Sequence, residues 1–216
     1  LRSLVGSEMC IRDRHKINPL RANYISERTE LKNKKILDVA CGGGLLAEAL
    51  FSEGAKVSGV DISDVAIHTA KNHAKKKNID INYILGEAEN LLPENSEEFD
   101  VVTCLEAIEH VPDPNQLVKT CSDLCKKHGD IFFSTINRNP KSFLFAIVGA
   151  EYILNLLPKG THEYQKFIKP SELIFMMENN GLKIQELTGM SYNPITKNYW
   201  LGKNVDVNYL IHAKKI

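Results

Sequence analysis

A short apolar strand that runs directly into a cluster of glycines constrains this chain more than any other feature. The strand is expected over residues 35–40, the glycines begin at Gly42 and end at Gly44, and residues 45–51 have the apolar spacing of a helix. Glycines at such a turn permit positive φ and close approach by a ligand, and the helix that follows directs free N–H groups toward it. Asp61 ends the next expected strand, where its carboxylate could accept hydrogen bonds from ribose hydroxyls. The pattern predicts a site for an adenosine-bearing cofactor.

The identity of that cofactor is not decided by the loop alone. An NAD site is the main alternative, because a strand, a glycine turn, a helix and an acid are common to both kinds of site. The dinucleotide fingerprint G-x-G-x-x-G is absent, since Ala40 occupies its first position and Leu45 follows the last glycine. A glycine-rich turn that binds nothing is the remaining alternative.

Short apolar runs alternate with longer helical patterns along most of the chain. This alternation predicts an α/β fold with a doubly wound, Rossmann-like sheet that is mostly parallel and has helices on both faces. Two late strands are expected to form an antiparallel edge. The expected strands are 35–40, 56–61, 81–85, 99–104, 129–135, 184–188 and 207–213, and the expected helices are 18–30, 45–51, 64–78, 115–127 and one beginning near Pro170.

The chain has 216 residues, which suits one domain. Its 27 basic and 27 acidic residues balance, so no global field indicates a nucleic-acid partner. The five cysteines are odd in number and include no CxxC pair, which favours a reducing compartment over a disulfide framework. Cys121 and Cys125 are interpreted as core-facing residues one helical turn apart. Residues 1–14 are expected to be a foreign or disordered leader, and residues 15–216 a single domain with an apolar insertion at about 140–169.

An acidic–histidine cluster follows the fourth expected strand. If the segment is helical, Glu106, Glu109 and His110 share one face. Two carboxylates and an imidazole could hold a divalent ion such as Mg²⁺. Without a metal, His110 could act as the general base, because an unperturbed imidazole has a pKa of about 6.5. A capped and cross-linked loop with no catalytic role is the third possibility.

The residues after the third expected strand form a weaker candidate. Glu87, followed by Ala88, could reach the exocyclic amine of an adenine. The alternative is a helix N-terminus at which acids are favourable.

Residues Phe143–Leu157 are very apolar, yet too short and too interrupted to span a bilayer. Nearby lysines suggest that such a helix lies in a lipid interface. The alternatives are a lid over a hydrophobic substrate and an ordinary core helix.

From His15 onward the sequence resembles the ubiquinone-biosynthesis O-methyltransferases, a family of class I S-adenosylmethionine-dependent enzymes. The insertion and the C-terminal strings carry most of the likeness, because the glycine loop is generic to methyltransferases. The matching strings include N-P-L-R from Asn18, C-G-G-G from Cys41, C-L-E from Cys104, E-H-V-P-D-P from Glu109, F-S-T from Phe133, V-G-A-E-Y-I-L from Val148, P-K-G-T-H from Pro158 and Y-N-P-I-T from Tyr192.

The resemblance implies cofactor contacts at Arg21, Ala40, Asp61 and Leu105, and a metal held by Glu106, Glu109 and His110. The family usually has glycine at Ala40, and alanine is expected to fit there if its φ is negative. The insertion resembles the family's lipid-associating segment. An aromatic-rich helix usually precedes His15 in the family, and residues 1–14 do not match it.

The resemblance further implies methyl transfer to the oxygen of a polyprenylated catechol or quinol. The expected partners are this substrate, a membrane surface and a ubiquinone-biosynthesis complex. The expected location is cytoplasmic and peripheral to the inner membrane, or the matrix side in a mitochondrion. A methyltransferase for another phenol or quinone, and a non-catalytic membrane-associated relic, are the alternatives.

Overall fold

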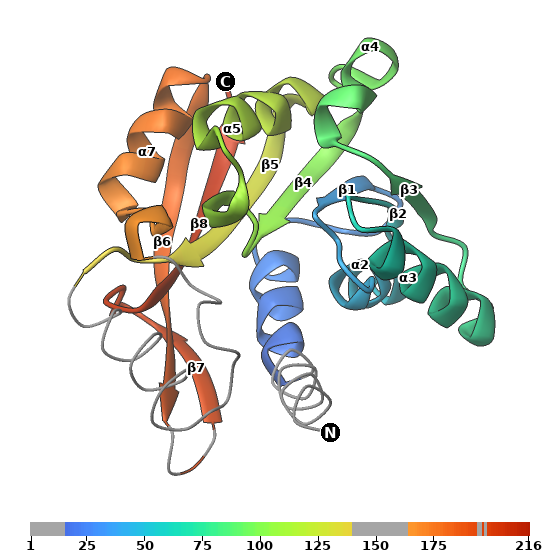
Figure 1. Ribbon diagram of the computed structural model, residues 1–216, viewed down its shortest axis with the longest axis horizontal. Helices are drawn as coiled ribbons and strands as arrows, with labels where there is room; N and C mark the ends of the chain where they lie inside the picture. The colour runs from blue at the N-terminus through green and yellow to red at the C-terminus, as the bar shows by residue number, and fades with distance from the viewer. Residues whose placement is uncertain (1–15, 140–163, 194–195, 197) are drawn as a thin grey trace.

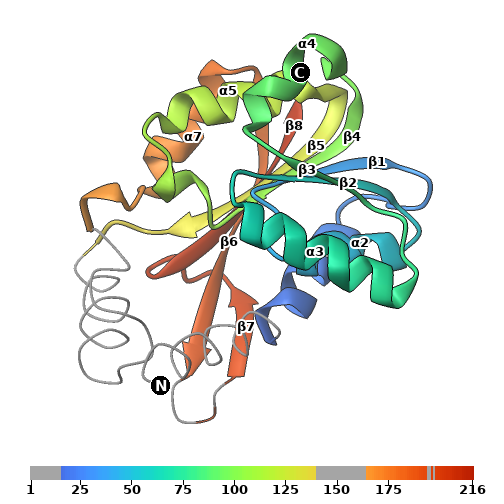
Figure 2. The same cartoon turned by 45° about the vertical axis from the view of Figure 1, so that its right-hand side comes forward.

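One eight-stranded sheet organises the described part of the computed structural model, which comprises residues 16–139, 164–193, 196 and 198–216. The strand order is β3-β2-β1-β4-β5-β8-β6-β7 (Figures 1 and 2). The strands are β1 Lys35–Val39, β2 Lys56–Asp61, β3 Asn82–Leu85, β4 Phe99–Leu105, β5 Cys125–Ile136, β6 Leu182–Asn193, β7 Asn198–Gly202 and β8 Asn208–Lys215.

The first five strands are parallel, and their order reverses between β1 and β4. The register pairs Val39 of β1 with Val60 on one side and with Cys104 on the other. Leu105 of β4 pairs with Ser134 of β5. The carboxyl ends of these strands therefore lie together at the switch point, where ligands bind in open α/β sheets. The expected doubly wound α/β fold is confirmed.

The last three strands are antiparallel and differ in detail from the expectation. β8 lies between β5 and β6, so only one of the two late strands is near the edge. The outermost position belongs to β7, which the sequence pattern did not predict and which pairs with an extended β6.

Helices cover both faces of the sheet (Figure 1). The N-terminal helix (residues 16–26) packs with α2 (Leu45–Ser52) and α3 (Asp64–Lys77) on one face. On the other face α5 (Pro114–Leu124) packs with α7 (Pro170–Asn179). Short helical turns complete the described part at η1 Ala88–Leu91, α4 Leu92–Asn95, η2 Ile108–His110 and η4 Tyr164–Lys166.

Local capping explains where the two longer helices begin. The Ser63 hydroxyl accepts the Ala66 N–H at 3.3 Å at the start of α3. The Asp113 carboxylate accepts the Gln116 N–H at 3.0 Å at the start of α5. These side chains satisfy N–H groups that the helix itself leaves unpaired.

The expectation that a helix extends to Lys127 is wrong. α5 ends at Leu124, and Cys125 already has extended backbone and pairs with Phe99 of β4. Cys121 and Cys125 are both buried, but they belong to a helix and to a strand rather than to consecutive helical turns.

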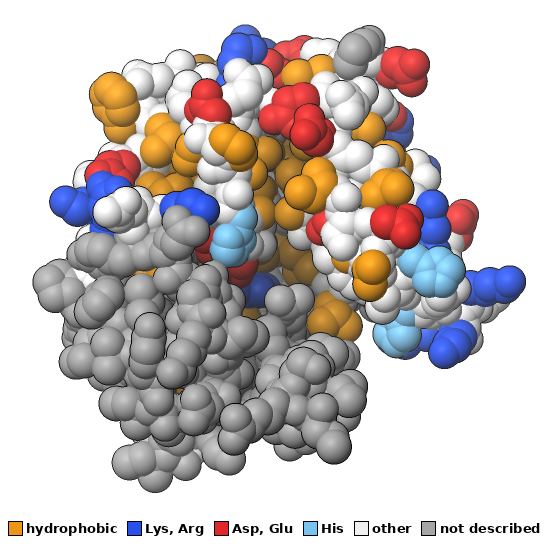
Figure 3. Space-filling model, in the orientation of Figure 1, with side chains coloured by type: hydrophobic (Ala, Val, Ile, Leu, Met, Phe, Trp, Pro, Cys, Tyr) orange, Lys and Arg blue, Asp and Glu red, His pale blue; other side chains and the backbone are white. Residues whose placement is uncertain are grey.

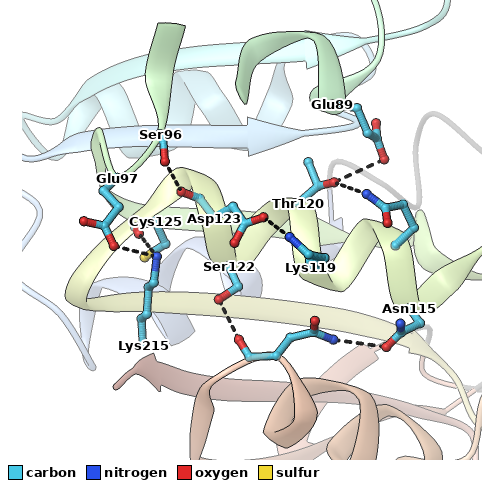
Figure 4. Close-up of polar contacts among 12 residues, drawn as sticks. Glu89, Ser96, Glu97, Asn115, Lys119, Thr120, Ser122, Asp123, Cys125 and Lys215 are labelled. Atoms are coloured by element: carbon cyan, nitrogen blue, oxygen red, sulfur yellow. Dashed lines mark hydrogen bonds and ion pairs between the residues drawn. The ribbon is translucent and has the colours of Figure 1, made fainter. Parts of the chain in front are cut away.

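Polar contacts along α5 fix it to its neighbours (Figure 4). The Ser122 hydroxyl donates to the Asn180 carbonyl at 2.8 Å, and the Asn180 amide donates to Asn115 Oδ1 at 3.0 Å. Lys119 pairs with Asp123 one turn later along the same helix. The spacing between α5 and α7 is therefore set by hydrogen bonds as well as by apolar packing.

The leader at residues 1–14 and the apolar segment Phe143–Leu157 lie outside the described residues. Among the helices that are described, none is both long and apolar enough to cross a membrane.

Candidate cofactor site and active site

Asp61 holds the glycine loop in place from the end of the neighbouring strand. Its Oδ2 atom accepts the Gly42 N–H at 2.8 Å, and its Oδ1 atom accepts the Ser63 N–H at 2.8 Å. Gly42 has a φ of 55° and Gly44 a φ of 81°. A Cβ atom on Gly44 would lie 2.2 Å from Tyr83 Oη, so both conformation and space require glycine there.

Ala40 also has a left-handed backbone, with a φ of 56°. The expectation that alanine fits this position with negative φ is therefore wrong. The turn from β1 into the glycine loop dictates the conformation, and alanine adopts it at a cost that glycine would avoid.

Replacing Ala40 with Gly is expected to raise the free energy of unfolding by up to about 1 kcal/mol, because the strain is removed. In a chain of this size that corresponds to an increase in Tm of about 2–4 °C in thermal unfolding. Ala49→Gly in the interior of α2 is the matched control, and it should lower stability by about 1 kcal/mol. A Tm for Ala40→Gly below that of the unchanged protein would show that the alanine methyl group makes favourable contacts.

The segment after β3 lies at the same edge of the sheet. The Gly86 N–H donates to the Asp61 carbonyl at 3.0 Å. Glu87 is exposed and precedes η1, whereas Ala88 is buried in the core beneath it. The structure thus places Glu87 where a ligand can contact it and gives Ala88 a packing role, with its backbone beside the loop.

Arg21 reaches this edge from the N-terminal helix. The helix is fixed to the glycine loop because the Asn18 amide donates to the Leu45 carbonyl at 2.9 Å. The Arg21 Nη2 atom lies 2.9 Å from Glu106 Oε1, and the Arg21 side chain is 15% exposed. Its Nε atom is buried without a hydrogen-bond partner. An unpaired buried donor costs free energy, and a carboxylate ligand would satisfy it, so Arg21 fits an acidic group of the cofactor.

Glu106 follows Leu105, the half-buried last residue of β4, and is held from both sides. Its N–H donates to the Ser134 carbonyl at 3.0 Å, and the Ser134 hydroxyl donates to Glu106 Oε1 at 2.9 Å. Its φ of 56° turns the chain sharply at the end of the strand. Strain in a non-glycine residue at a strand end is typical of functional sites.

Glu109 is 3% exposed and lies beneath this turn. The Thr135 hydroxyl donates to Glu109 Oε2 at 2.8 Å. Burial, and then the nearby charge of Glu106, raise the pKa of Glu109 to about 8. Two carboxylates that repel each other in this way attract either a proton or a cation.

The three residues of the acidic–histidine cluster do not share a helical face as expected. Glu106 lies outside η2 because of its positive φ, Glu109 points into the core, and His110 is exposed. Within residues 16–139, 164–193, 196 and 198–216, no three His, Cys, Asp or Glu side chains are grouped so that they could hold a metal. The carboxylates of Glu106 and Glu109 interact electrostatically, since the charge of Glu106 contributes to the raised pKa of Glu109.

Four residues that the sequence analysis did not assign help to build the site. Ser134 and Thr135 orient the two glutamates, as described above. Asp38, at the end of β1, accepts the Thr103 hydroxyl at 2.7 Å, and burial raises the pKa of its carboxyl to about 7. The sequence signal that could have assigned these four residues to the site is weak. Small polar residues at the end of an apolar strand indicate a site only when the neighbouring strands are known.

Comparison with known proteins agrees with this geometry. A methyltransferase-domain family model matches residues 37–133. The chain is 56% identical to the ubiquinone biosynthesis O-methyltransferase of Saccharophagus degradans, over 94% of this chain and 86% of the relative. It is 55% identical to the enzyme of the same name from Marinobacter nauticus, over 93% of this chain and 85% of the relative.

Solved structures with low sequence identity share the fold. The magnesium protoporphyrin IX methyltransferase of Synechocystis PCC 6803 with bound SAH has a TM-score of 0.69 and 17% identity, over 94% of this chain and 84% of that one. The cyclase SpnF has a TM-score of 0.68 and 13% identity, over 92% of this chain and 81% of that one. A fold that supports both a methyltransferase and a cyclase does not itself specify the reaction.

Proposed function

The chain belongs to the ubiquinone biosynthesis O-methyltransferase family, and we propose that it transfers the methyl group of S-adenosylmethionine to one oxygen of a polyprenylated catechol or quinol. The single observation that carries this proposal, beside the family, is the arrangement at the end of β4. Arg21 with an unsatisfied Nε atom lies between the glycine loop and the Glu106–Glu109 pair. One side of Arg21 suits the cofactor and the other suits the reacting end of the acceptor.

Binding and orientation account for most of the proposed rate acceleration. S-adenosylmethionine, when bound, supplies an electrophilic methyl group. Arg21 would pair with its carboxylate through Nε while Nη2 stays on Glu106. The loop from Ala40 to Gly44 and the carboxylates of Asp61 and Glu87 would surround its nucleoside part. Holding two reactants in line for transfer supplies on the order of 7–11 kcal/mol in favourable cases.

His110 is assigned the removal of the acceptor proton. It is exposed at the end of η2, directly after the buried Glu109 that anchors the turn. A neutral imidazole suits proton removal near neutral pH. The acceptor oxygen would lie between His110 and the methyl donor.

Glu106 and Glu109 are the residues that would hold a divalent cation, with Mg²⁺ the ion best suited to two carboxylates. Burial and the neighbouring Glu106 raise the pKa of Glu109 to about 8, and a cation beside the two carboxylates would offset the second of these causes. Such an ion would relieve the repulsion and favour the phenolate form of the acceptor. His110 does not join the two carboxylates in the described arrangement, so we assign it no metal bond.

We also propose a peripheral membrane location, on the cytoplasmic side of the inner membrane or the matrix side in a mitochondrion. The support is the apolar sequence Phe143–Leu157 together with a polyprenylated acceptor that resides in lipid. A complex with other ubiquinone-biosynthesis proteins would keep such an acceptor out of water.

The direct test is methyl transfer from labelled S-adenosylmethionine to a short-chain polyprenyl catechol. Product is expected with Mg²⁺, and chelation is expected to lower turnover by at least about tenfold because the ion would no longer favour the phenolate form of the acceptor. The measurement is product formed with Mg²⁺, with chelator, and with Mg²⁺ restored.

Product that is unaffected by chelation would leave the methyltransferase proposal intact and leave His110 as the sole base. Cofactor binding without product on catechols, quinols and simple phenols would contradict the proposed reaction.

A further inference from the structure

A groove of about 770 Å³ lies beside the proposed active site and is not used by the mechanism above. We propose that this groove, between η2 and the first turns of α5 on one side and α7 on the other, binds the isoprenoid tail of the acceptor. The inference rests on the proposed polyprenylated acceptor and assigns its tail a place on the protein. The volume is within the range of small-molecule sites, roughly 300–1,000 Å³.

The groove is continuous with the site because Glu109 belongs to both. Ile108 and Glu109 of η2 line one end of the groove. Glu109 also accepts the Thr135 hydroxyl beneath the reacting position. If the catechol ring of the acceptor lies near Glu106 and His110, its isoprenoid tail can therefore extend along η2 toward α7.

The wall chemistry suits an uncharged apolar chain. Val111, Phe167, Ile168, Phe175 and Met176 contribute apolar side chains to the wall. Figure 3 shows hydrophobic side chains gathered over the region of α5 and α7. Arg138, also in the wall, is paired with Glu172, so its charge is already compensated. An isoprenoid chain would be stabilised here by the burial of its apolar surface. An anionic ligand would have to compete with Glu172 for Arg138.

One aromatic side chain of the groove wall is largely exposed to solvent. Phe175 on α7 is 66% exposed, although its neighbours Leu173 and Met177 are fully buried. Its ring offers apolar surface at the rim of the groove that a bound apolar chain can remove from water. Burial of such a ring by a ligand contributes about 1.5–3 kcal/mol, which corresponds to about tenfold or more in affinity.

The groove is built before any ligand arrives. Asn180 at the end of α7 is hydrogen-bonded to Ser122 and Asn115 of α5 (Figure 4 shows the α5 partners). The floor is fixed because the Ile168 N–H donates to the Ile136 carbonyl at 3.2 Å. The buried Tyr209 hydroxyl donates to the Ile168 carbonyl at 2.9 Å. A preformed groove requires little ordering on binding, which favours affinity for a short tail.

The test measures binding rather than turnover. Kd values for catechol and for geranyl-substituted catechol are determined by calorimetry with the enzyme saturated by S-adenosylhomocysteine. The unchanged protein is expected to prefer the geranyl compound. Phe175→Asp, which makes the rim charged, should reduce that preference by about tenfold or more. Ser171→Trp, which fills the groove from the exposed start of α7, should reduce it by a similar factor.

Ile216→Asp is the matched control, because Ile216 is 68% exposed and is not among the groove residues. It should retain the full preference, and thermal unfolding should show that all three variants are folded. A preference that is absent in the unchanged protein, or that survives both groove variants, would overturn the inference. Tail-dependent binding without methyl transfer would support the groove while contradicting the proposed reaction.

Discussion

Replacing His110 with Asn is expected to lower kcat by about two to four powers of ten, while the Kd for S-adenosylhomocysteine changes by no more than about threefold. The asymmetry follows from the structure, because His110 is exposed at the end of η2, whereas Arg21 and the glycine loop belong to other segments of the chain. The turn itself is held by the buried Glu109 and by the His110 N–H, which donates to the Ala107 carbonyl. Asparagine retains that backbone bond and removes only the imidazole.

Two measurements separate a catalytic role for His110 from a structural one. The pH profile of kcat should lose its rise near neutrality in the variant, because the group that accepts the proton is gone. His128→Asn is the control. His128 is exposed near the start of β5, whereas the site lies beside the end of that strand, and its left-handed backbone accepts asparagine. Equal losses of kcat and of cofactor affinity in His110→Asn would show that the residue supports the fold of the site rather than the reaction.

Replacing Arg21 with Gln is expected to raise the Kd for S-adenosylmethionine by about 10- to 100-fold. The reason is the loss of a charge-assisted pair, worth about 1.5–3 kcal/mol, between the guanidinium and the cofactor carboxylate. The variant should also unfold more easily, because Glu106 and the buried Glu109 lose a neighbouring cation. Calorimetric titration gives the first effect and thermal unfolding the second.

The control for Arg21 lies only seven residues further along the chain. Arg28 pairs with Glu186 at 2.5 Å and lies 3.6 Å from the centre of the Tyr24 ring, so it fastens the end of the N-terminal helix to β6. Arg28→Gln should lower stability and leave cofactor affinity nearly unchanged. Similar Kd values for the two variants would mean that Arg21 acts only by docking the helix.

The sequence was sufficient for the parallel half of the fold, since apolar strands, glycine turns and caps are local signals. β2 was predicted with its observed bounds, and α3 begins at Asp64 as expected. The errors arose where distant pairing overrides local pattern. Cys125 continues a helical pattern in the sequence, yet pairing with Phe99 makes it the first residue of β5.

The arrangement of the candidate site could not be predicted from the sequence. Residue spacing places Glu106, Glu109 and His110 on one helical face, whereas a single left-handed residue, Glu106, separates them. The partners of the glutamates, Ser134 and Thr135, become apparent only from the register that aligns Leu105 with Ser134. Spacing along a chain reports neither a local reversal of φ nor the register of two strands.

The position of β8 also determines the order in which the sheet can be completed during synthesis. It comes later in the chain than β5 and β6, yet it lies between them and pairs with both. While a ribosome is still adding residue 207, both neighbours have an open hydrogen-bonding edge, and such edges are sites of aggregation. β5 and β6 can therefore be joined into one sheet only after β8 has been synthesised.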